Sequence, residues 1–270
     1  MGTDAIDSLS PLASDLRAND PDRYTATLFA PPRARASLIA LYAFDHELAR
    51  LGTVVREPVA GLIRLQWWED VVDALEADRT LHHPVVQELR RAVAEGGLDI
   101  GHLKRAIDGR RRPFEEDRPP SLQTFERYLC DIGGGVTSAA AALLGAGDDR
   151  ALVTADRVGS VRAAFEQVRL LERSSDGLGP WLPLAWLEPR DDRSDKAASA
   201  TVLALLAEWA LAELSSARLE RAPIARSSLA AYFPGTLAGL RLHSCQERRH
   251  QARLSTAVPA LFWCWLRGRF

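Results

Sequence analysis

The chain has few cysteines, which limits both its cross-links and its metal chemistry. Cys130, Cys245 and Cys264 are the only three among 270 residues. Their number is odd, no two have CxxC spacing, and none lies in a short cysteine–histidine cluster. We therefore expect neither a disulfide framework nor a structural zinc site, and the composition suits a reducing, cytoplasmic compartment.

Long apolar runs and strong net charge are also missing. No run of about 18 apolar residues occurs, so we expect no membrane-spanning helix. Residues 1–22 are acidic and lack an apolar core segment, so no secretory signal is expected. The net charge of −2 gives no general attraction to nucleic acid.

Helical spacing of apolar residues dominates the sequence, and no convincing strand alternation or internal repeat occurs. Proline at a first turn and Ser121 as an N-cap mark several helix starts. We predict one all-α domain over residues 1–270, with residues 1–20 poorly ordered. The predicted helices are 31–51, 58–77, 84–94, 100–111, 121–144, 148–173, 194–219, 227–242 and 247–266.

Four short blocks occur in a fixed order. They are Tyr42-Ala43-Phe44; Arg64-Leu65-Gln66-Trp67-Trp68 followed by His83-Pro84-Val85; Ile107-Asp108-Gly109 with Phe125, Tyr128 and the glycines 133–135; and Gln167 with Arg173 and Leu182-Pro183. Together they span roughly residues 20–240, and the chain resembles the squalene/phytoene synthase family. The resemblance implies an isoprenoid synthase-type helical bundle around a central, largely apolar cavity.

The same resemblance implies two aspartate clusters, where Mg²⁺ neutralises the charge of a departing diphosphate. At the first cluster this chain has Ala49, Arg50 and Thr53 instead. At the second, Ser174 follows Arg173 and only Asp176 remains. These side chains offer too few hard oxygen ligands for Mg²⁺. We expect no metal and no cofactor there, with Mg²⁺ required only if the chain is an enzyme.

Eight residues are the candidates for lining the cavity or binding a ligand in it, and none has an assigned catalytic role. They are Arg35, Tyr42, Asp45, His46, Ala49, Gln167, Arg173 and Asp176. Tyr42 and Ala49 are seven residues apart and share a helix face. Asp45 and Glu47 are two apart and do not share one, which favours a cavity-facing polar residue over a metal ligand.

Other features have two interpretations each. Arg35 and Arg50 could bind a diphosphate or belong to a solvated helix face. The glycines at 133–135 indicate a close helix crossing or a helix break. The C-terminal segment Phe262-Trp263-Cys264-Trp265-Leu266, followed by two arginines, either docks on a membrane or partner or closes the core.

The blocks around Phe44 and Trp67 are most similar to one branch of the family, which has degenerate metal motifs and includes a mitochondrial complex I assembly factor. This resemblance implies a bacterial, non-catalytic accessory factor. Its partners would be respiratory complex subunits, with peripheral contact to the inner membrane from the cytoplasm. Two alternatives stay open: a head-to-head prenyl-diphosphate transferase and a non-catalytic isoprenoid carrier.

Overall fold

Proline begins five of the helices in the computed structural model. These helices are α1 (Pro11–Asn19), α2 (Pro21–Thr27), α3 (Pro32–Val54), α4 (Pro58–Asp73) and α5 (Pro84–Ala94). The preference is physical, since the first helical N–H groups have no acceptor within the helix and proline has none to lose. The structure describes residues 10–75, 83–95, 97–173, 179–187, 195–220, 224–246 and 261–270.

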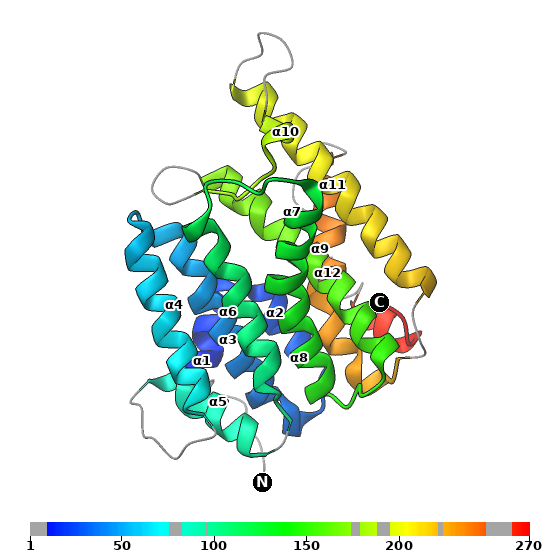
Figure 1. Ribbon diagram of the computed structural model, residues 1–270. Helices are drawn as coiled ribbons and strands as arrows, with labels where there is room; N and C mark the ends of the chain where they lie inside the picture. Colours follow the sequence, from blue (N-terminus) through cyan, green and yellow to red (C-terminus); the bar gives the residue numbers. More distant parts are fainter. Residues whose placement is uncertain are drawn as a thin grey trace.

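The remaining helices complete an all-α bundle, shown in Figure 1, and the described residues contain no strand. They are α6 (Ile100–Glu115), α7 (Leu122–Leu129), the π-helical turn η1 (Cys130–Gly134), α8 (Gly135–Leu143), α9 (Asp149–Arg173), α10 (Leu184–Leu187), α11 (Asp195–Glu220), the 3₁₀ turn η2 (Arg226–Ser228) and α12 (Leu229–Gln246). The all-α prediction is confirmed. Residues 247–260 of the last predicted helix lie outside the described residues, and 261–266 are helical.

The N-terminal region is helical in its described part. Residues 1–20 are expected from the sequence to be poorly ordered; the first nine lie outside the described part, and α1 follows Ser10. The Ser10 side chain caps α1 at the N–H of Ala13, and Leu16 is buried. Asp20 then caps α2 in the same way, at the N–H of Arg23. Two short capped helices therefore cover one side of α3.

The glycine-rich stretch forms a close helix crossing. A Cβ atom on Gly133 would lie 2.1 Å from the carbonyl oxygen of Gly159, and one on Gly159 would lie 2.2 Å from that of Gly133. Only residues without a side chain allow η1 and α9 to approach so closely. The backbone widens into a π-helical turn at the same point, so the crossing and the helix break coincide.

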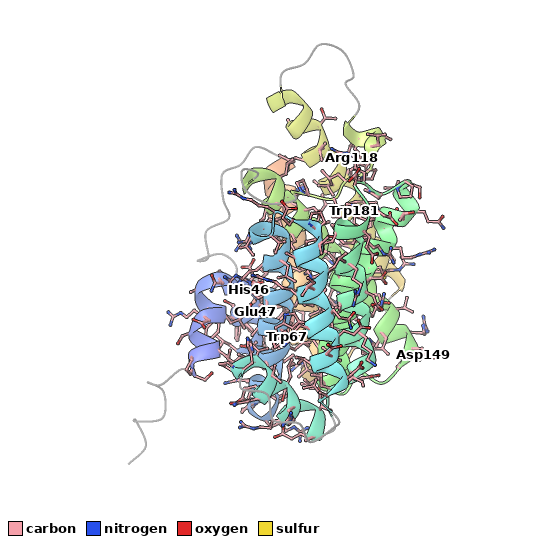
Figure 2. The ribbon with its side chains drawn as sticks, turned by 60° about the vertical axis from the view of Figure 1, so that its left-hand side comes forward. His46, Glu47, Trp67, Arg118, Asp149 and Trp181 are labelled. Carbon is pink, nitrogen blue, oxygen red and sulfur yellow. The ribbon has the colours of Figure 1, made fainter. Side chains whose placement is uncertain are left out.

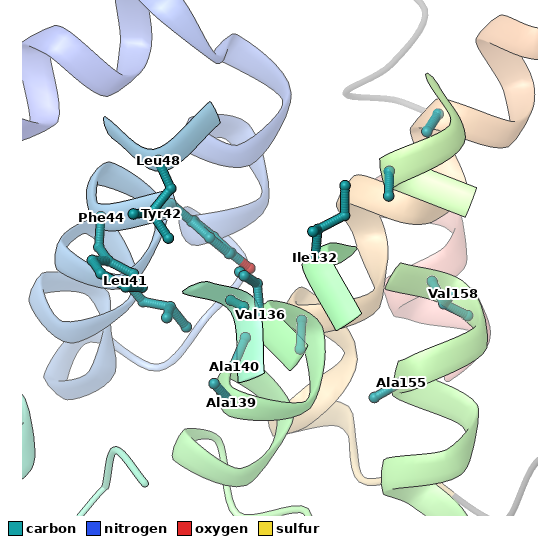
Figure 3. Packing of buried hydrophobic residues seen from close by; sticks show 14 of the residues in the cluster. Leu41, Tyr42, Phe44, Leu48, Ile132, Val136, Ala139, Ala140, Ala155 and Val158 are labelled. Atoms are coloured by element: carbon teal, nitrogen blue, oxygen red, sulfur yellow. The ribbon is translucent and has the colours of Figure 1, made fainter. Parts of the chain in front are cut away.

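The hydrophobic core lies where α3, α8 and α9 meet. Figure 3 shows part of it, with Leu41, Tyr42, Phe44 and Leu48 from α3 facing Ile132, Val136, Ala139 and Ala140, and with Ala155 and Val158 from α9. Of the adjacent tryptophans, Trp68 is buried at 4% exposure and Trp67 is exposed at 41%. This matches the roughly 100° between neighbouring helical side chains.

Helix α11 bears on the expectation that no helix of this chain spans a membrane. Within the described residues, Ala200–Leu219 of α11 is long and apolar enough to cross a membrane, judged by length and composition alone. Charged residues such as Glu208 and Glu213 interrupt its sequence, which is why no continuous apolar run occurs. The buried positions, among them Leu206, Ala210 and Leu214, repeat at helical spacing. That face packs against α9 and α12.

Candidate functional site

A small cleft separates α3 from α9, at the place where the sequence predicts a cavity. Its volume is about 80 Å³, and its lining residues are Asp20, His46, Ala49, Arg50, Thr53, Arg162, Glu166, Arg169 and Leu170. Five of these nine residues are charged. Figure 2 shows His46 beside Glu47 on α3.

Buried ion pairs occupy the space next to this cleft. Six residues form what we call the buried ion-pair cluster: Asp20, Arg23, Asp45, Arg110, Arg162 and Glu166. Its three carboxylates and three guanidinium groups balance in charge. They come from α2, the turn before it, α3, α6 and α9, so the cluster ties four helices together.

Arg110 joins the two halves of this cluster. Its Nη2 donates to Asp45 Oδ1 at 2.8 Å, and its Nη1 donates to Glu166 Oε1 at 2.8 Å. On the other side of Asp45, Arg23 Nη1 lies 2.6 Å from Oδ2 as an ion pair. Arg162 Nη2 donates to Asp20 Oδ2 at 2.6 Å. Asp45 is therefore held between two cations and is only 1% exposed.

The surroundings shift the protonation of these groups. Burial alone would raise the pKa of Asp45, but the guanidinium groups of Arg110 and Arg23 outweigh burial and hold that pKa below its ordinary value. The pKa of Asp20 is lowered in the same way, by Arg162 and Arg23 against the effect of burial. Both carboxylates are thus ionised and already neutralised by protein.

His46 lines the cleft in its neutral form. Burial lowers the pKa of its imidazole, and the carboxylates of Asp20 and Glu47 oppose this only in part. At neutral pH the ring therefore adds no charge to the cleft. Arg50, which stands at a position of the missing aspartate cluster, reaches Glu47 Oε1 at 3.4 Å and is largely exposed.

Tyr42 and Gln167 were expected to line the cavity with Ala49, but only Ala49 reaches the cleft. Tyr42 is 2% exposed and lies under the Arg23 guanidinium, 5.1 Å from its ring centroid. Gln167 is fully buried. The Arg23 guanidinium covers the Tyr42 ring, and Gln167 is bound to Tyr128 and to the backbone of Trp181.

Gln167 has a structural role instead. Its Nε2 donates to Tyr128 Oη at 3.3 Å, and its Oε1 accepts the backbone N–H of Trp181 at 3.0 Å. The indole of Trp181, labelled in Figure 2, donates to the carbonyl oxygen of Glu116 at 3.0 Å. Gln167 therefore fixes the segment before α10 against α9.

Arg35 lies away from the cleft. It donates to the backbone carbonyl oxygens of Ala30 and Leu28, at 3.1 and 3.0 Å, and lines a separate groove beside Phe262. Arg173 is the last residue of α9, and its side chain is outside the described part. Asp176 also lies outside the described residues.

The described lining of the cleft does not suit the magnesium that the family resemblance implies. Ala49 and Thr53 provide no carboxylate, and Arg50 brings a positive charge. The carboxylates that do face the cleft, Asp20 and Glu166, already bind Arg162 and Arg110. Across the described ranges, no three His, Cys, Asp or Glu side chains are grouped as metal ligands would be.

Comparison with known proteins identifies the family and the fold of the chain. Residues 16–263 match the family described as squalene/phytoene synthase. A dehydrosqualene synthase crystal structure superposes with a TM-score of 0.68 at 16% identity, covering 95% of each chain. Squalene synthase HpnC from Alicyclobacillus acidocaldarius gives 0.69 at 17% identity, covering 89% of this chain and 94% of its own. At such identities the likeness shows the fold alone, which confirms the predicted isoprenoid synthase class.

The sequence relatives have a different name from these structural neighbours. The NADH dehydrogenase (ubiquinone) complex I, assembly factor 6 of Mus musculus is 30% identical over 169 residues, which is 63% of this chain and 51% of the relative. The Homo sapiens protein of that name is 29% identical over 154 residues, covering 57% and 46%. The chain therefore spans about half the length of the curated relatives it matches.

Proposed function

We propose that the chain, which belongs to the squalene/phytoene synthase family, does not ionise prenyl diphosphates and acts as an assembly factor for respiratory complex I. One observation carries the first half of this proposal. The carboxylates beside the cleft are neutralised by Arg23, Arg110 and Arg162 and not left open for metal. Ionisation of a diphosphate needs cations that stabilise the leaving group, held in place by free carboxylates.

The size of the cleft also argues against turnover of a prenyl substrate. Its volume of about 80 Å³ compares with roughly 300–1,000 Å³ for pockets that enclose drug-sized ligands. A prenyl chain with its diphosphate needs a space of that larger size. The proposal therefore needs neither Mg²⁺ nor another cofactor.

The second half of the proposal comes from the relatives. Proteins named as complex I assembly factor 6 match this chain in Mus musculus, Bos taurus and Homo sapiens at 29–31% identity. We extend that role to this chain. Its partners are then subunits of respiratory complex I, met at the cytoplasmic face of the inner membrane of a bacterium.

A specific observation favours one of the alternatives, a non-catalytic isoprenoid carrier, as a second candidate. The Nε and Nη1 atoms of Arg162 are buried and have no hydrogen-bond partner among the described groups. Arg162 lines the cleft together with Arg50 and Arg169. A small anionic headgroup, such as the phosphate of an isoprenoid, would satisfy these atoms without metal.

Deleting the gene from its source organism tests the assembly role. We expect assembled complex I, measured on native gels and by NADH–ubiquinone reductase activity, to fall and to return when the wild-type chain is supplied. The variant Ala49→Leu, which fills the cleft, should restore complex I equally well, because the proposed role does not use the cleft. A carrier would lose function in this variant.

Unchanged complex I after deletion would contradict the assembly role. Failure of Ala49→Leu to restore it, despite wild-type levels of folded protein, would instead favour the carrier. The variant's melting temperature provides the folding control.

A further inference from the structure

The C-terminal segment both closes the core and exposes aromatic side chains. Leu261 is fully buried, and Phe270 stacks on Tyr232 with ring centroids 5.0 Å apart. Between them, Phe262 is 51% and Trp263 54% exposed. The segment, red in Figure 1, lies at the edge of the bundle beside the end of α11. Leu261 and Phe270 therefore close the core, whereas Phe262 and Trp263 are exposed and free to contact a membrane or partner.

These aromatic residues border an apolar groove of about 470 Å³. Its lining residues come from three separate parts of the chain and are Leu28, Phe29, Ala30, Pro31, Pro32, Arg35, Arg226, Ser227, Phe262 and Trp265. Leu28 and Leu266 add exposed apolar area, at 48% and 41% exposure. We call the surface formed by segments 28–36, 224–229 and 261–270 the aromatic–arginine face.

The charge of this face has one sign. Its three segments contain Arg33, Arg35, Arg226, Arg267 and Arg269, and no aspartate or glutamate. The chain as a whole has a net charge of −2, so five acid-free arginines on one face are a local excess. Arg218 of α11 donates to the carbonyl oxygen of Phe270 at 3.1 Å.

Contacts within the face hold several of these cations beside the aromatic rings without neutralising them. The guanidinium carbon of Arg267 lies 4.3 Å from the ring centroid of Trp263. Arg226 donates to the carbonyl oxygen of Leu266 at 2.8 Å and lies 5.9 Å from the Trp265 centroid. Arg35 is bound to carbonyl oxygens in the same way. Their partners among the described residues are dipoles and rings, so the positive charges remain available to an anion.

We propose that the aromatic–arginine face binds the surface of an anionic lipid bilayer. Tryptophan and phenylalanine side chains insert at the level of the lipid headgroups, and arginine binds their phosphates. Each basic residue near such a surface strengthens attachment. The inference is independent of the assembly role, because it depends only on this face and on lipid.

A second exposed apolar surface shows why the charge around such a surface determines whether an anionic bilayer can bind it. Val59, Ile63 and Trp67 follow one another along α4, at 68%, 65% and 41% exposure. Glu69 and Asp70 lie beside this ridge together with Arg64, and Glu69 is paired with Arg111. The charges here are mixed in sign, so this ridge lacks the excess of arginine that attracts an anionic bilayer.

Co-sedimentation of the full chain with vesicles tests the proposal. We expect binding to vesicles of phosphatidylcholine mixed with phosphatidylglycerol, little binding to phosphatidylcholine alone, and weakening as salt is raised. The double variant Arg267→Glu with Arg269→Glu should bind anionic vesicles at least roughly tenfold more weakly than the wild-type chain. Its control is Arg91→Glu with Arg118→Glu, which changes net charge equally outside the face and should bind like wild type.

Two tryptophan variants distinguish the contribution of aromatic insertion to lipid binding from the contribution of charge. Trp263→Ala should weaken binding while leaving the melting temperature unchanged, because the side chain is half exposed. Trp67→Ala on α4 is its control and should not affect binding. Equal loss in both arginine variants would overturn the proposal. So would failure of the wild-type chain to sediment with either vesicle, and an acidic protein surface would then be the occupant to seek.

Discussion

Replacing Arg110 with alanine is expected to lower the free energy of unfolding by about 3–5 kcal/mol. The change removes the partner that Asp45 and Glu166 share, at 2.8 Å from each. Asp45 keeps Arg23 but is fully enclosed, so its remaining charge is poorly compensated. Urea denaturation followed by circular dichroism measures the effect, and the variant should melt early or fail to fold.

Arg91→Ala is the matched control. Arg91 forms an ion pair with Glu88 at 3.1 Å, but 63% of its side chain is exposed. Exposed pairs of this kind contribute roughly 0–1 kcal/mol, so this variant should unfold almost like wild type. Similar losses in the two variants would contradict the view that the buried ion-pair cluster holds the helices together.

Gly133→Ala is expected to destabilise the protein by about 3 kcal/mol. The added Cβ would lie 2.1 Å from the carbonyl oxygen of Gly159. Both groups belong to the backbone at a helix crossing, so no side chain can rotate away and η1 must separate from α9. Denaturant unfolding again measures the change.

Gly52→Ala on α3 is expected to stabilise the protein, in contrast to Gly133→Ala. A Cβ at Gly52 would meet nothing within 4 Å. Alanine loses less backbone entropy than glycine on entering a helix, so this variant should gain roughly 0.5–1 kcal/mol. If Gly133→Ala were as stable as Gly52→Ala, the close crossing would not exist in solution.

Most of the fold could be predicted because its signals are local. Proline at a first turn places the starts of α3, α4 and α5. Apolar spacing then gives the buried faces. Three short helices, α1, α2 and α10, were missed because each is too brief to show a periodic pattern, although Ser10 and Asp20 are ordinary N-caps. The prediction for α6 ended at Arg111, whereas the helix continues through Pro113 to Glu115.

The site was only partly predictable. The absence of aspartates at Ala49 and Thr53 is visible in the sequence, and both residues do line the cleft. The pairing that neutralises the neighbouring carboxylates is not visible. Arg110 lies 65 residues from Asp45 and 56 from Glu166, and Arg162 lies 142 from Asp20. Spacing rules detect neighbours within one or two helix turns, so they cannot pair such distant side chains.

The location of Tyr42 and Gln167 follows from the same long-range pairing. Helical spacing puts Tyr42 on the same face as Ala49, and the family resemblance makes Gln167 a candidate. The arginine above Tyr42 comes from α2, and the partners of Gln167 come from α7 and from the segment before α10. Each side chain is enclosed by groups that sequence spacing alone does not reveal.

Pyrophosphate release is the measurement that tests the central claim most directly. Purified protein is incubated with farnesyl or geranylgeranyl diphosphate, with and without Mg²⁺, and an active squalene synthase is assayed in parallel. Because the cleft's carboxylates are bound by Arg110 and Arg162, we predict no release above the rate without protein in either condition. Mg²⁺-dependent release from either substrate would contradict the non-catalytic account and identify the chain as a prenyltransferase.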